Sequence, residues 1–482
     1  MDPQMVETSA RPLCVDLDGT LVSTDCLWES LFLLGRQAPL AALSVPYWFL
    51  AGKATAKRRI SDRVLPNPST LPYRAELIER LKAEKAGGRK LYLVTASDQR
   101  IANVVAGHLG LFEEAIGSDG QRNLKGPAKA TYLTERFGKG GFDYAGDSSA
   151  DLPVWQAADR PWLVGASSSL VAAVKAAQPQ AEVVVPRAGG RAKAIVKALR
   201  PHQWMKNLLL FVAAILGHVR EPVAFGWLLV AFFAFSFTAS SVYVLNDLLD
   251  LEQDRQHRSK RKRPFASGLL SIPTGLVLFP LVLGLGLFLG GFFLPWKFTV
   301  ALLGYFALTT VYSFYLKRKL ILDVLALGGL FTYRVLAGGL AVGVQVSFWL
   351  LAFSLFFFTG LAFVKRFSEL IETQAKELDR VPGRNYWVSD LQIITSIGPA
   401  CGLIAVLIFC LYMNSPEVLR LYPRPEALWL IVPVLIYWNT RVWFLAGRDQ
   451  LHDDPVVFAI RDRNSYLAGL VAGLCILAAT YG

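Results

Sequence analysis

The densest group of potentially reactive side chains follows an apolar run and begins at residue 246. The segment NDLLDLEQDRQHRSKRKRP (246–264) contains four acids and then six bases. If a helix continues from the apolar run, four polar residues lie three or four apart on one face: Asn246, Asp247, Asp250 and Asp254. Carboxylates that close together repel one another unless a cation lies between them. Mg²⁺ suits this position, because it is usually held by one or two carboxylates together with substrate phosphates.

The bases of residues 255–263 follow the acids directly. Lys260 and Arg263 are candidates to neutralise further phosphate oxygens. Acids and bases together describe a site for a diphosphate–Mg²⁺ complex at a membrane surface. The alternative is a plain charged loop that only sets the orientation of the chain. The bases alone favour that loop, whereas the acids at helical spacing favour the binding site.

A second pair of acids ends an apolar run near the N-terminus, in LCVDLDGT (13–20). This pattern indicates a buried strand with Asp16 and Asp18 at its carboxyl end, where α/β sheets place their sites. Three further apolar runs follow, separated by helix-length segments: 89–97, 142–151 and 161–165. The pattern predicts a parallel sheet flanked by helices.

The elements that must position these groups differ between the two parts of the chain. The 482 residues are 53% hydrophobic, which is too apolar for an ordinary soluble protein. Long apolar runs begin at Leu208, and we count nine candidate membrane spans, each of which would need roughly 20 apolar residues: 205–219, 224–249, 269–291, 298–316, 320–342, 347–364, 391–413, 426–446 and 464–481. We therefore predict three regions: an α/β domain over 1–185, a basic linker over 186–204 and an all-α, nine-helix membrane domain over 205–482.

The charges of the loops predict how the spans are oriented. With nine spans and a cytoplasmic N-terminus, the internal loops carry 17 bases and the external loops four. Positive residues accumulate in cytoplasmic loops, so residues 246–264 and the N-terminal domain are expected in the cytoplasm. The first twelve residues contain no apolar stretch typical of a cleaved signal peptide. Much of the formal charge of +13 lies beside the apolar spans, where membrane orientation explains it, so nucleic acid is not expected as a partner.

The segment 246–264, together with the FASG that follows it, resembles the NDxxDxxxD motif of the UbiA-type intramembrane prenyltransferases. The resemblance covers about residues 195–482, and the nine predicted spans fit that fold. It implies a diphosphate bound through Mg²⁺ at two acidic motifs on cytoplasmic loops. The second motif normally carries a pair of aspartates, but YSFYLKRKLILD (312–323) retains only Asp323 and contains three consecutive bases.

Several segments resemble one subgroup of that family, the decaprenyl-phosphate phosphoribosyltransferases: LRPHQWMKN (199–207), YSFYLK (312–317), LDVLALGGLFTYRVLAGG (322–339), VKRFSEL (364–370) and DPVVFAIRDRNSY (454–466). The resemblance implies phosphoribosyl pyrophosphate as donor and a polyprenyl phosphate as acceptor. It implies Mg²⁺ at Asn246, Asp247, Asp250 and Asp254. The residues predicted to contact substrate are Lys206, Asn207, Lys260, Arg263, Tyr312, Lys317, Asp323, Arg334, Lys365 and Arg366. Arg334 lies within a span, where a charge is rarely without a role, so it could bind a phosphate. The alternative is that Arg334 forms a buried pair with Asp323.

Residues 11–180 resemble the haloacid dehalogenase-like phosphatases, whose fold is Rossmann-like with a helical cap. The resemblance implies Asp16 as the nucleophile that forms an aspartyl-phosphate and Asp18 as general acid and then base. Thr95 and Lys129 would bind the phosphoryl group. Mg²⁺ would be held by the acids of the same motifs: Asp16, Asp18, Asp147 and Asp151.

The predicted cap, at about 21–75, is unusually apolar around LFLLGRQAPLAALSVPYWFLAGKATAKRR. It could contact lipid, dock on the membrane domain, or form an ordinary cap core. The linker 186–204 could likewise lie on an anionic membrane surface as a basic helix, or be a solvated linker.

Together the two resemblances imply a bifunctional enzyme of the bacterial inner membrane with both sites on the cytoplasmic side. It would make polyprenyl-phosphate 5-phosphoribose, a precursor of cell-wall arabinan, and then remove the 5-phosphate. One alternative is a prenyltransferase whose soluble domain serves in regulation or assembly, and a transporter is a more distant one.

Overall fold

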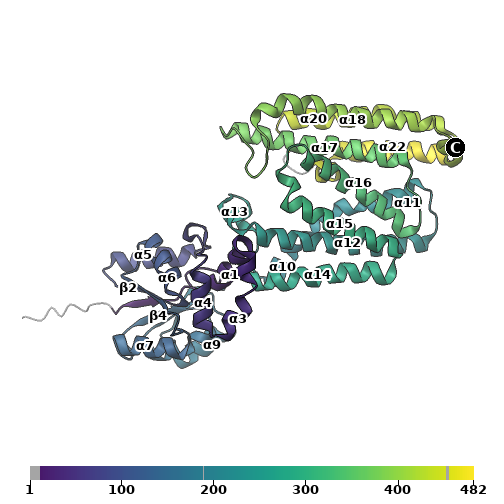
Figure 1. Cartoon of the computed structure of the whole chain (residues 1–482). Coiled ribbons are helices and arrows are strands. Elements are labelled where there is room, and N and C mark those ends of the chain that lie inside the picture. Colours follow the sequence, from purple (N-terminus) through teal and green to yellow (C-terminus); the bar gives the residue numbers. More distant parts are fainter. Residues whose placement is uncertain (1–10, 188, 452–454, 482) are drawn as a thin grey trace, which may run out of the picture. The chain divides into compact units, whose positions relative to one another are not determined.

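The computed structural model describes residues 11–187, 189–451 and 455–481, apart from the side chain of residue 460. The first ten residues and Asp454 of the motif DPVVFAIRDRNSY lie outside this description. The chain divides into two compact units, which are described separately (Figure 1). The N-terminal unit contains Met1–Ala198 and Asp247–Val277, and the membrane unit contains Leu199–Asn246 and Leu278–Gly482. The motif segment that follows Asn246 is thus part of the N-terminal unit.

Six parallel strands form the sheet of the N-terminal unit, in the order β3-β2-β1-β4-β5-β6. They are β1 (Leu13–Val15), β2 (Leu91–Asp98), β3 (Glu114–Ser118), β4 (Asp143–Gly146), β5 (Pro161–Val164) and β6 (Glu182–Val185). The prediction of a parallel sheet is confirmed, and the four predicted runs correspond to β1, β2, β4 and β5. The sequence did not indicate β3 (EAIGS) and β6 (EVVV).

Helices cover both faces of this sheet (Figure 1). They are α5 (Ala75–Ala86), α6 (Gln99–Leu109), α7 (Pro127–Phe137), α8 (Leu152–Ala157) and α9 (Ser168–Ala177). Successive side chains of a strand point to opposite faces, and β1 follows this rule. Leu13 and Val15 belong to the core that includes residues of α5 and α6, whereas Cys14 belongs to the core that includes residues of α7, α8 and α9.

A helical insertion separates β1 from α5, in the region predicted as a cap. It contains α1 (Cys26–Gln37), α2 (Pro39–Ala42), α3 (Val45–Leu50), α4 (Lys53–Ser61) and the short 3₁₀ helix η1 (Pro68–Thr70). An antiparallel bridge between Val22 and Tyr73 joins its two ends. Leu34, Trp48 and Ile60 contribute to a small core of its own.

Eight helices of the described residues are long and apolar enough to cross a membrane. They correspond to eight of the nine predicted spans: α12 (Pro222–Leu249), α14 (Ile272–Phe293), α15 (Trp296–Phe314), α16 (Leu322–Val342), α17 (Phe348–Ala375), α18 (Leu391–Met413), α20 (Ile431–Gly447) and α22 (Arg463–Tyr481). Short elements lie between them: α13 (Leu251–Gln256), η4 (Lys260–Lys262), η5 (Leu316–Arg318), η6 (Val388–Asp390), α19 (Pro416–Leu421), η7 (Pro425–Leu430) and α21 (Pro455–Arg461). The predicted linker contains α10 (Arg191–Leu199).

The count of nine full-length helices is not confirmed by the structure. The predicted span 205–219 instead folds as the 3₁₀ helix η3 (Pro201–Phe211) followed by the short α-helix α11 (Val212–Leu216). A 3₁₀ helix rises about 2.0 Å per residue and an α-helix about 1.5 Å, so the two together are about 30 Å long. A segment of fewer than 18 residues therefore reaches the length of a full span because it is wound more tightly.

The contact between η3 and α16 depends on a glycine. A Cβ atom at Gly338 would lie 1.9 Å from the backbone oxygen of Leu210, whereas at Gly329, also on α16, it would meet nothing within 4 Å. Gly338→Ala should therefore destabilise the membrane unit by about 1–3 kcal/mol or more, and Gly329→Ala should not. Thermal unfolding monitored by size-exclusion chromatography compares the two variants. Equal melting temperatures would contradict this packing.

Candidate active sites

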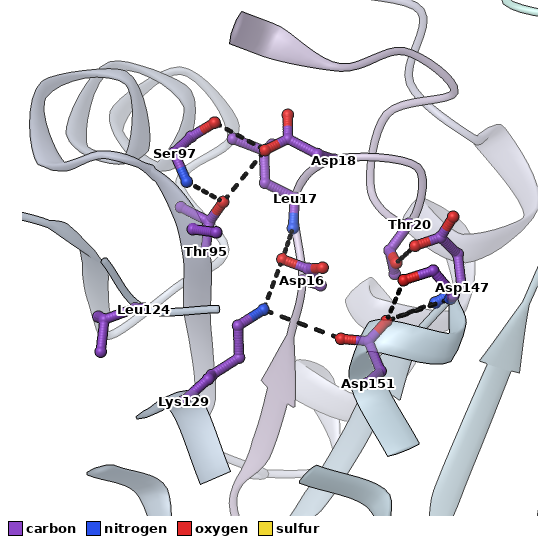
Figure 2. Close-up of polar contacts among 12 residues, drawn as sticks. Asp16, Leu17, Asp18, Thr20, Thr95, Ser97, Leu124, Lys129, Asp147 and Asp151 are labelled. Carbon is purple, nitrogen blue, oxygen red and sulfur yellow. Dashed lines mark hydrogen bonds and ion pairs between the residues drawn. The ribbon is translucent and has the colours of Figure 1, made fainter. Parts of the chain in front are cut away.

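Three carboxylates converge at the carboxyl edge of the sheet, where β1 and its neighbour β4 end (Figure 2). Asp16 follows β1, Asp147 follows β4, and Asp151 lies at the end of the 3₁₀ turn η2 (Ser149–Asp151). One oxygen from each lies within 4.8 Å of the others. Such an all-oxygen donor set fits Mg²⁺, which prefers carboxylate ligands.

A buried lysine balances part of this negative charge. Lys129 of α7 is 2% exposed, and its Nζ lies 2.9 Å from Oδ1 of Asp16. Nζ also donates to the hydroxyl of Tyr144 at 2.7 Å, and this hydroxyl donates to Oδ1 of Asp151 at 2.9 Å. Oδ2 of Asp151 accepts hydrogen bonds from the backbone N–H groups of Asp147 and Ser148, both at 3.2 Å. Asp151 is thereby fixed in orientation as well as buried.

Asp18 points to the other side of the site, toward β2 (Figure 2). Its Oδ2 accepts from the hydroxyl of Ser97 at 2.6 Å and from that of Thr95 at 3.4 Å. Its Oδ1 accepts from the backbone N–H of Cys26 at 2.8 Å. Of the four predicted metal ligands of this unit, Asp16, Asp147 and Asp151 therefore lie together. The carboxylate of Asp18 lies apart from them. Ser97 was not singled out from the sequence, although it lies two residues after Thr95 and thus on the same face of the strand.

Burial sets the protonation of the converging acids. It raises the pKa of Asp16 to about 8, with Asp151 and Asp18 raising it further and Lys129 opposing them. Burial, together with the charge of Asp151, raises the pKa of Asp147 to about 7. Gly19 makes room for this geometry: its φ is +79°, and a Cβ atom there would lie 2.3 Å from Oδ2 of Asp147. The cluster is therefore crowded, and the charges of Lys129 and Arg74 offset only part of the effect of burial on the pKa values of Asp16 and Asp147.

A cavity of about 330 Å³ lies within the membrane unit. Its lining carries five cationic side chains: Arg200, Lys206, Arg334, Lys365 and Arg384. Asn246 and Tyr312 also line it, and no carboxylate occurs among its described lining residues. Five of the predicted residues thus meet here: Lys206, Asn246, Tyr312, Arg334 and Lys365. This concentration of positive charge suits a polyanionic ligand.

Other predicted residues lie behind the cavity wall. Arg334 donates to Oδ1 of Asn207 at 3.0 Å and to the hydroxyl of Tyr305 at 2.8 Å. Asn207 therefore positions Arg334, and the alternative pairing of Arg334 with Asp323 is wrong.

Asp323 is fully buried and instead contacts two other arginines, at 3.2 Å from Arg366 and 3.3 Å from Arg384. The hydroxyl of Tyr386 also donates to it at 2.6 Å. Arg366 is 1% exposed in its side chain and does not line the cavity. The remaining acid of the altered second motif is thus used to hold Arg384 in the cavity wall.

Arg200 and Arg384 also line the cavity, although neither was predicted to contact substrate. Arg200 lies within the quoted segment LRPHQWMKN, which is a usable signal. Arg384 follows α17 in a loop, and no spacing connects it to Asp323, 61 residues earlier. Lys317 lies in η5 and Lys260 in η4, and neither lines the cavity.

The acidic motif that begins at Asn246 does not form one continuous helix. The α-helix α12 ends at Leu249, and α13 starts at Leu251, with Asp250 at the break. The prediction of an unbroken helix is wrong here, because carboxylates near the C-terminus of a helix oppose its dipole. Two acids of the motif still meet around one cation: Nη1 of Arg263 lies 3.2 Å from Asp247 and 2.6 Å from Asp254. Asn246 donates to the hydroxyl of Ser313 at 3.0 Å.

Comparisons with known proteins identify a family for the C-terminal part of the chain. The model of the UbiA prenyltransferase family matches residues 207–461. An uncharacterized protein of Sinorhizobium fredii, y4nM, is 38% identical over 478 residues, which cover 97% of this chain and 91% of that protein. A decaprenyl-phosphate phosphoribosyltransferase of Mycobacterium tuberculosis is 34% identical over 182 residues, which cover 36% of this chain and 60% of that protein. A UbiA homolog from Archaeoglobus fulgidus, solved with GPP and Mg²⁺, is 18% identical with a TM-score of 0.44, over 59% of this chain and 97% of that one.

Proposed function

Because the chain belongs to the UbiA prenyltransferase family, we propose that its membrane unit is a transferase acting on a polyprenyl phosphate. The proposed donor is phosphoribosyl pyrophosphate, and the group transferred is 5-phosphoribose. The N-terminal unit then removes the 5-phosphate to leave polyprenyl-phosphate ribose. The similarity to the M. tuberculosis phosphoribosyltransferase supports this choice of donor and acceptor.

The observation that carries the proposal is the cationic cavity of the membrane unit. Its five cations would suit a donor that carries a diphosphate and a separate 5-phosphate, which has more charge than a prenyl diphosphate. Asp323 supports the same choice of donor, because its carboxylate pairs with Arg366 and Arg384 and so holds arginine side chains in place. A basic second motif is better suited to a phosphorylated sugar than to a second metal ion.

The transfer itself needs little acid–base chemistry from the chain. Asn246, Asp247, Asp250 and Asp254 are the residues that would hold Mg²⁺, which when bound would neutralise the pyrophosphate leaving group. The cavity arginines and lysines would stabilise the remaining phosphate oxygens. As the bond from the ribose carbon to pyrophosphate breaks, an oxygen of the lipid phosphate forms the new bond. That oxygen is already ionised at neutral pH, so no general base is required.

The phosphatase step would use the residues at the edge of the sheet. Asp16 attacks the 5-phosphate while Asp18 donates a proton to the departing ribose oxygen. Lys129, 2.9 Å from Asp16, balances charge on the resulting aspartyl-phosphate. Asp18 then takes a proton from the water that hydrolyses this intermediate and releases phosphate. When bound by Asp16, Asp147 and Asp151, Mg²⁺ would neutralise the phosphoryl oxygens during both steps.

The proposed location is the bacterial inner membrane, with both sites in the cytoplasm. The loop charges support this orientation. The combined length of η3 and α11, about 30 Å, matches the hydrocarbon core of a bilayer, so this segment can supply a ninth crossing. Two active sites on one chain would also keep the phosphorylated intermediate at a high effective concentration near the second site.

The transfer is tested with full-length protein in lipid nanodiscs, supplied with phosphoribosyl pyrophosphate and a polyprenyl phosphate. We expect pyrophosphate release that requires both substrates, and a lipid product whose mass corresponds to added ribose. No release with this pair would overturn the proposal. Release from a prenyl diphosphate in its place would favour prenyl transfer.

Binding of Mg²⁺ to the N-terminal unit should release protons. The pKa values of Asp16 and Asp147 are raised to about 8 and about 7, against an ordinary value of 3.8 in the unfolded chain. The metal-free folded state therefore binds more protons than the unfolded state, and its stability falls as pH rises from 3.8 toward 8. Mg²⁺ displaces these protons, so its affinity should rise as the pH increases and level off above a pH of about 8.

Calorimetric titration with Mg²⁺ in buffers of different ionisation enthalpy measures this proton release. The Asp147→Asn variant should release fewer protons and bind Mg²⁺ more weakly. Identical heats in all buffers for the unsubstituted protein would contradict the prediction.

A further inference from the structure

The helical insertion of the N-terminal unit contains an apolar hairpin, defined here as residues 39–51, between α1 and α4. Its sequence, PLAALSVPYWFLA, contains no charged residue. Leu40, Leu43 and Leu50 are 82%, 78% and 86% exposed, which makes them the three most exposed large apolar side chains among the described residues. Tyr47 is 69% exposed beside them. Phe348, on a membrane-spanning helix, is next in exposure at 76%.

The hairpin does not need these side chains for its own fold. The core of the insertion already contains Leu34, Trp48 and Ile60. Trp48 is 6% exposed, and the guanidinium of Arg63 lies 4.6 Å from the centre of its ring. The hairpin is therefore anchored to the core of the insertion by Trp48, while its three leucines are exposed. An ordinary cap core accounts for Trp48 but not for Leu40, Leu43 and Leu50.

Part of the backbone of the hairpin is hydrogen-bonded internally. The N–H groups of Ala42, Ser44, Trp48 and Ala51 donate to backbone oxygens within the insertion, at 3.0–3.3 Å. Proline supplies no N–H at positions 39 and 46. Segments that enter lipid must satisfy their backbone groups internally.

The charges around the hairpin favour an anionic surface. From residue 30 to residue 61 the chain contains five bases and no acid. The bases that flank the hairpin, Arg36 and Lys53, are both exposed. Leucines and a tyrosine at the tip with basic residues at the margin are typical of segments that bind a bilayer surface. The same chain also carries eight helices suited to cross a bilayer.

We propose that the apolar hairpin inserts into the interface of the membrane that the chain spans, with Arg36 and Lys53 among the anionic head groups. This inference does not depend on the proposed phosphatase activity. Its consequence for that activity would be a site held at the depth of lipid head groups.

The test uses full-length protein in nanodiscs of phosphatidylcholine and phosphatidylglycerol. A nitroxide is attached to Leu43→Cys or, in a second variant, to Leu50→Cys. The matched control is Lys139→Cys, at an exposed position of the same unit. Cys14, Cys26, Cys401 and Cys475 are buried and Cys410 is partly exposed, so the unsubstituted chain measures background labelling.

Electron paramagnetic resonance then compares collisions with dissolved oxygen and with a water-soluble nickel chelate. We expect an oxygen-to-nickel accessibility ratio several-fold higher at positions 43 and 50 than at position 139. A ratio equal to the control would mean that the hairpin lies in water. Labels that are immobilised and shielded from both reagents would mean that a protein surface covers it. Either result would overturn the proposal.

Discussion

Asp16→Asn should stop the phosphatase step, and polyprenyl-phosphate 5-phosphoribose should then accumulate while pyrophosphate release continues. The amide cannot form an aspartyl-phosphate, so we expect hydrolysis of the 5-phosphate to fall by at least about 10³-fold. Mass spectrometry of the lipid product measures this directly, because product with and without phosphate differ in mass. Continued release of the 5-phosphate at the original rate would show that Asp16 is not the nucleophile.

Loss of activity in this variant must be separated from loss of the fold. Asp16 is buried among like charges, and its raised pKa means that the folded metal-free protein already prefers it uncharged. Asparagine removes that charge at nearly the same volume, so the melting temperature of the metal-free N-terminal unit should stay equal or increase. Asp62→Asn is the matched control, because Asp62 is an exposed aspartate of the same unit paired with Arg100. It should retain full hydrolysis.

The sequence predicted the edge of the sheet well because the information there is local. Asp16 and Asp147 each end a short apolar run, and parallel strands bring their ends to one edge. The direction of Asp18 was not predictable in the same way. It depends on the N–H of Cys26 and the hydroxyl of Ser97, which belong to two other elements.

The membrane unit shows the limit of such reasoning more clearly. Hydropathy identified seven of the eight spans to within a few residues, since each span carries its own signal, but it ended the span of α17 at residue 364 instead of Ala375. It could not reveal that η3 is a 3₁₀ helix, because packing against Gly338 of α16 is a long-range contact. Nor could the sequence show that Asp323 pairs with Arg384 and not with Arg334, because Asp323 and Arg384 are 61 residues apart and only the tertiary structure brings them together.

Asp247→Asn should abolish the transfer while leaving hydrolysis of a soluble phosphate monoester intact. Asp247 is 1% exposed and is one of the two carboxylates that Arg263 contacts, so its charge is held at a fixed place next to Asn246. If that charge holds Mg²⁺ and thereby the pyrophosphate, its removal should lower pyrophosphate release by about 10²- to 10³-fold. Release is measured with phosphoribosyl pyrophosphate and polyprenyl phosphate in nanodiscs. Glu252→Gln is the matched control, an acid of the same motif outside the NDxxDxxxD pattern.

A second variant decides what Asp247 does. The alternative is a structural role, because Asp247 contacts Arg263 and its removal would leave the charge of Arg263 less well neutralised. If that role explained the loss, Arg263→Gln should reduce transfer as strongly as Asp247→Asn, and extra Mg²⁺ should restore neither. If Asp247 holds the metal ion, Arg263→Gln should need less Mg²⁺, because Asp247 and Asp254 lose a competing cation, whether or not loss of the predicted phosphate contact of Arg263 lowers the maximal rate. The Mg²⁺ concentration at half-maximal rate should then rise for Asp247→Asn and fall for Arg263→Gln. Opposite shifts of that concentration would assign Asp247 to the metal, and parallel shifts would assign it to the packing of the motif.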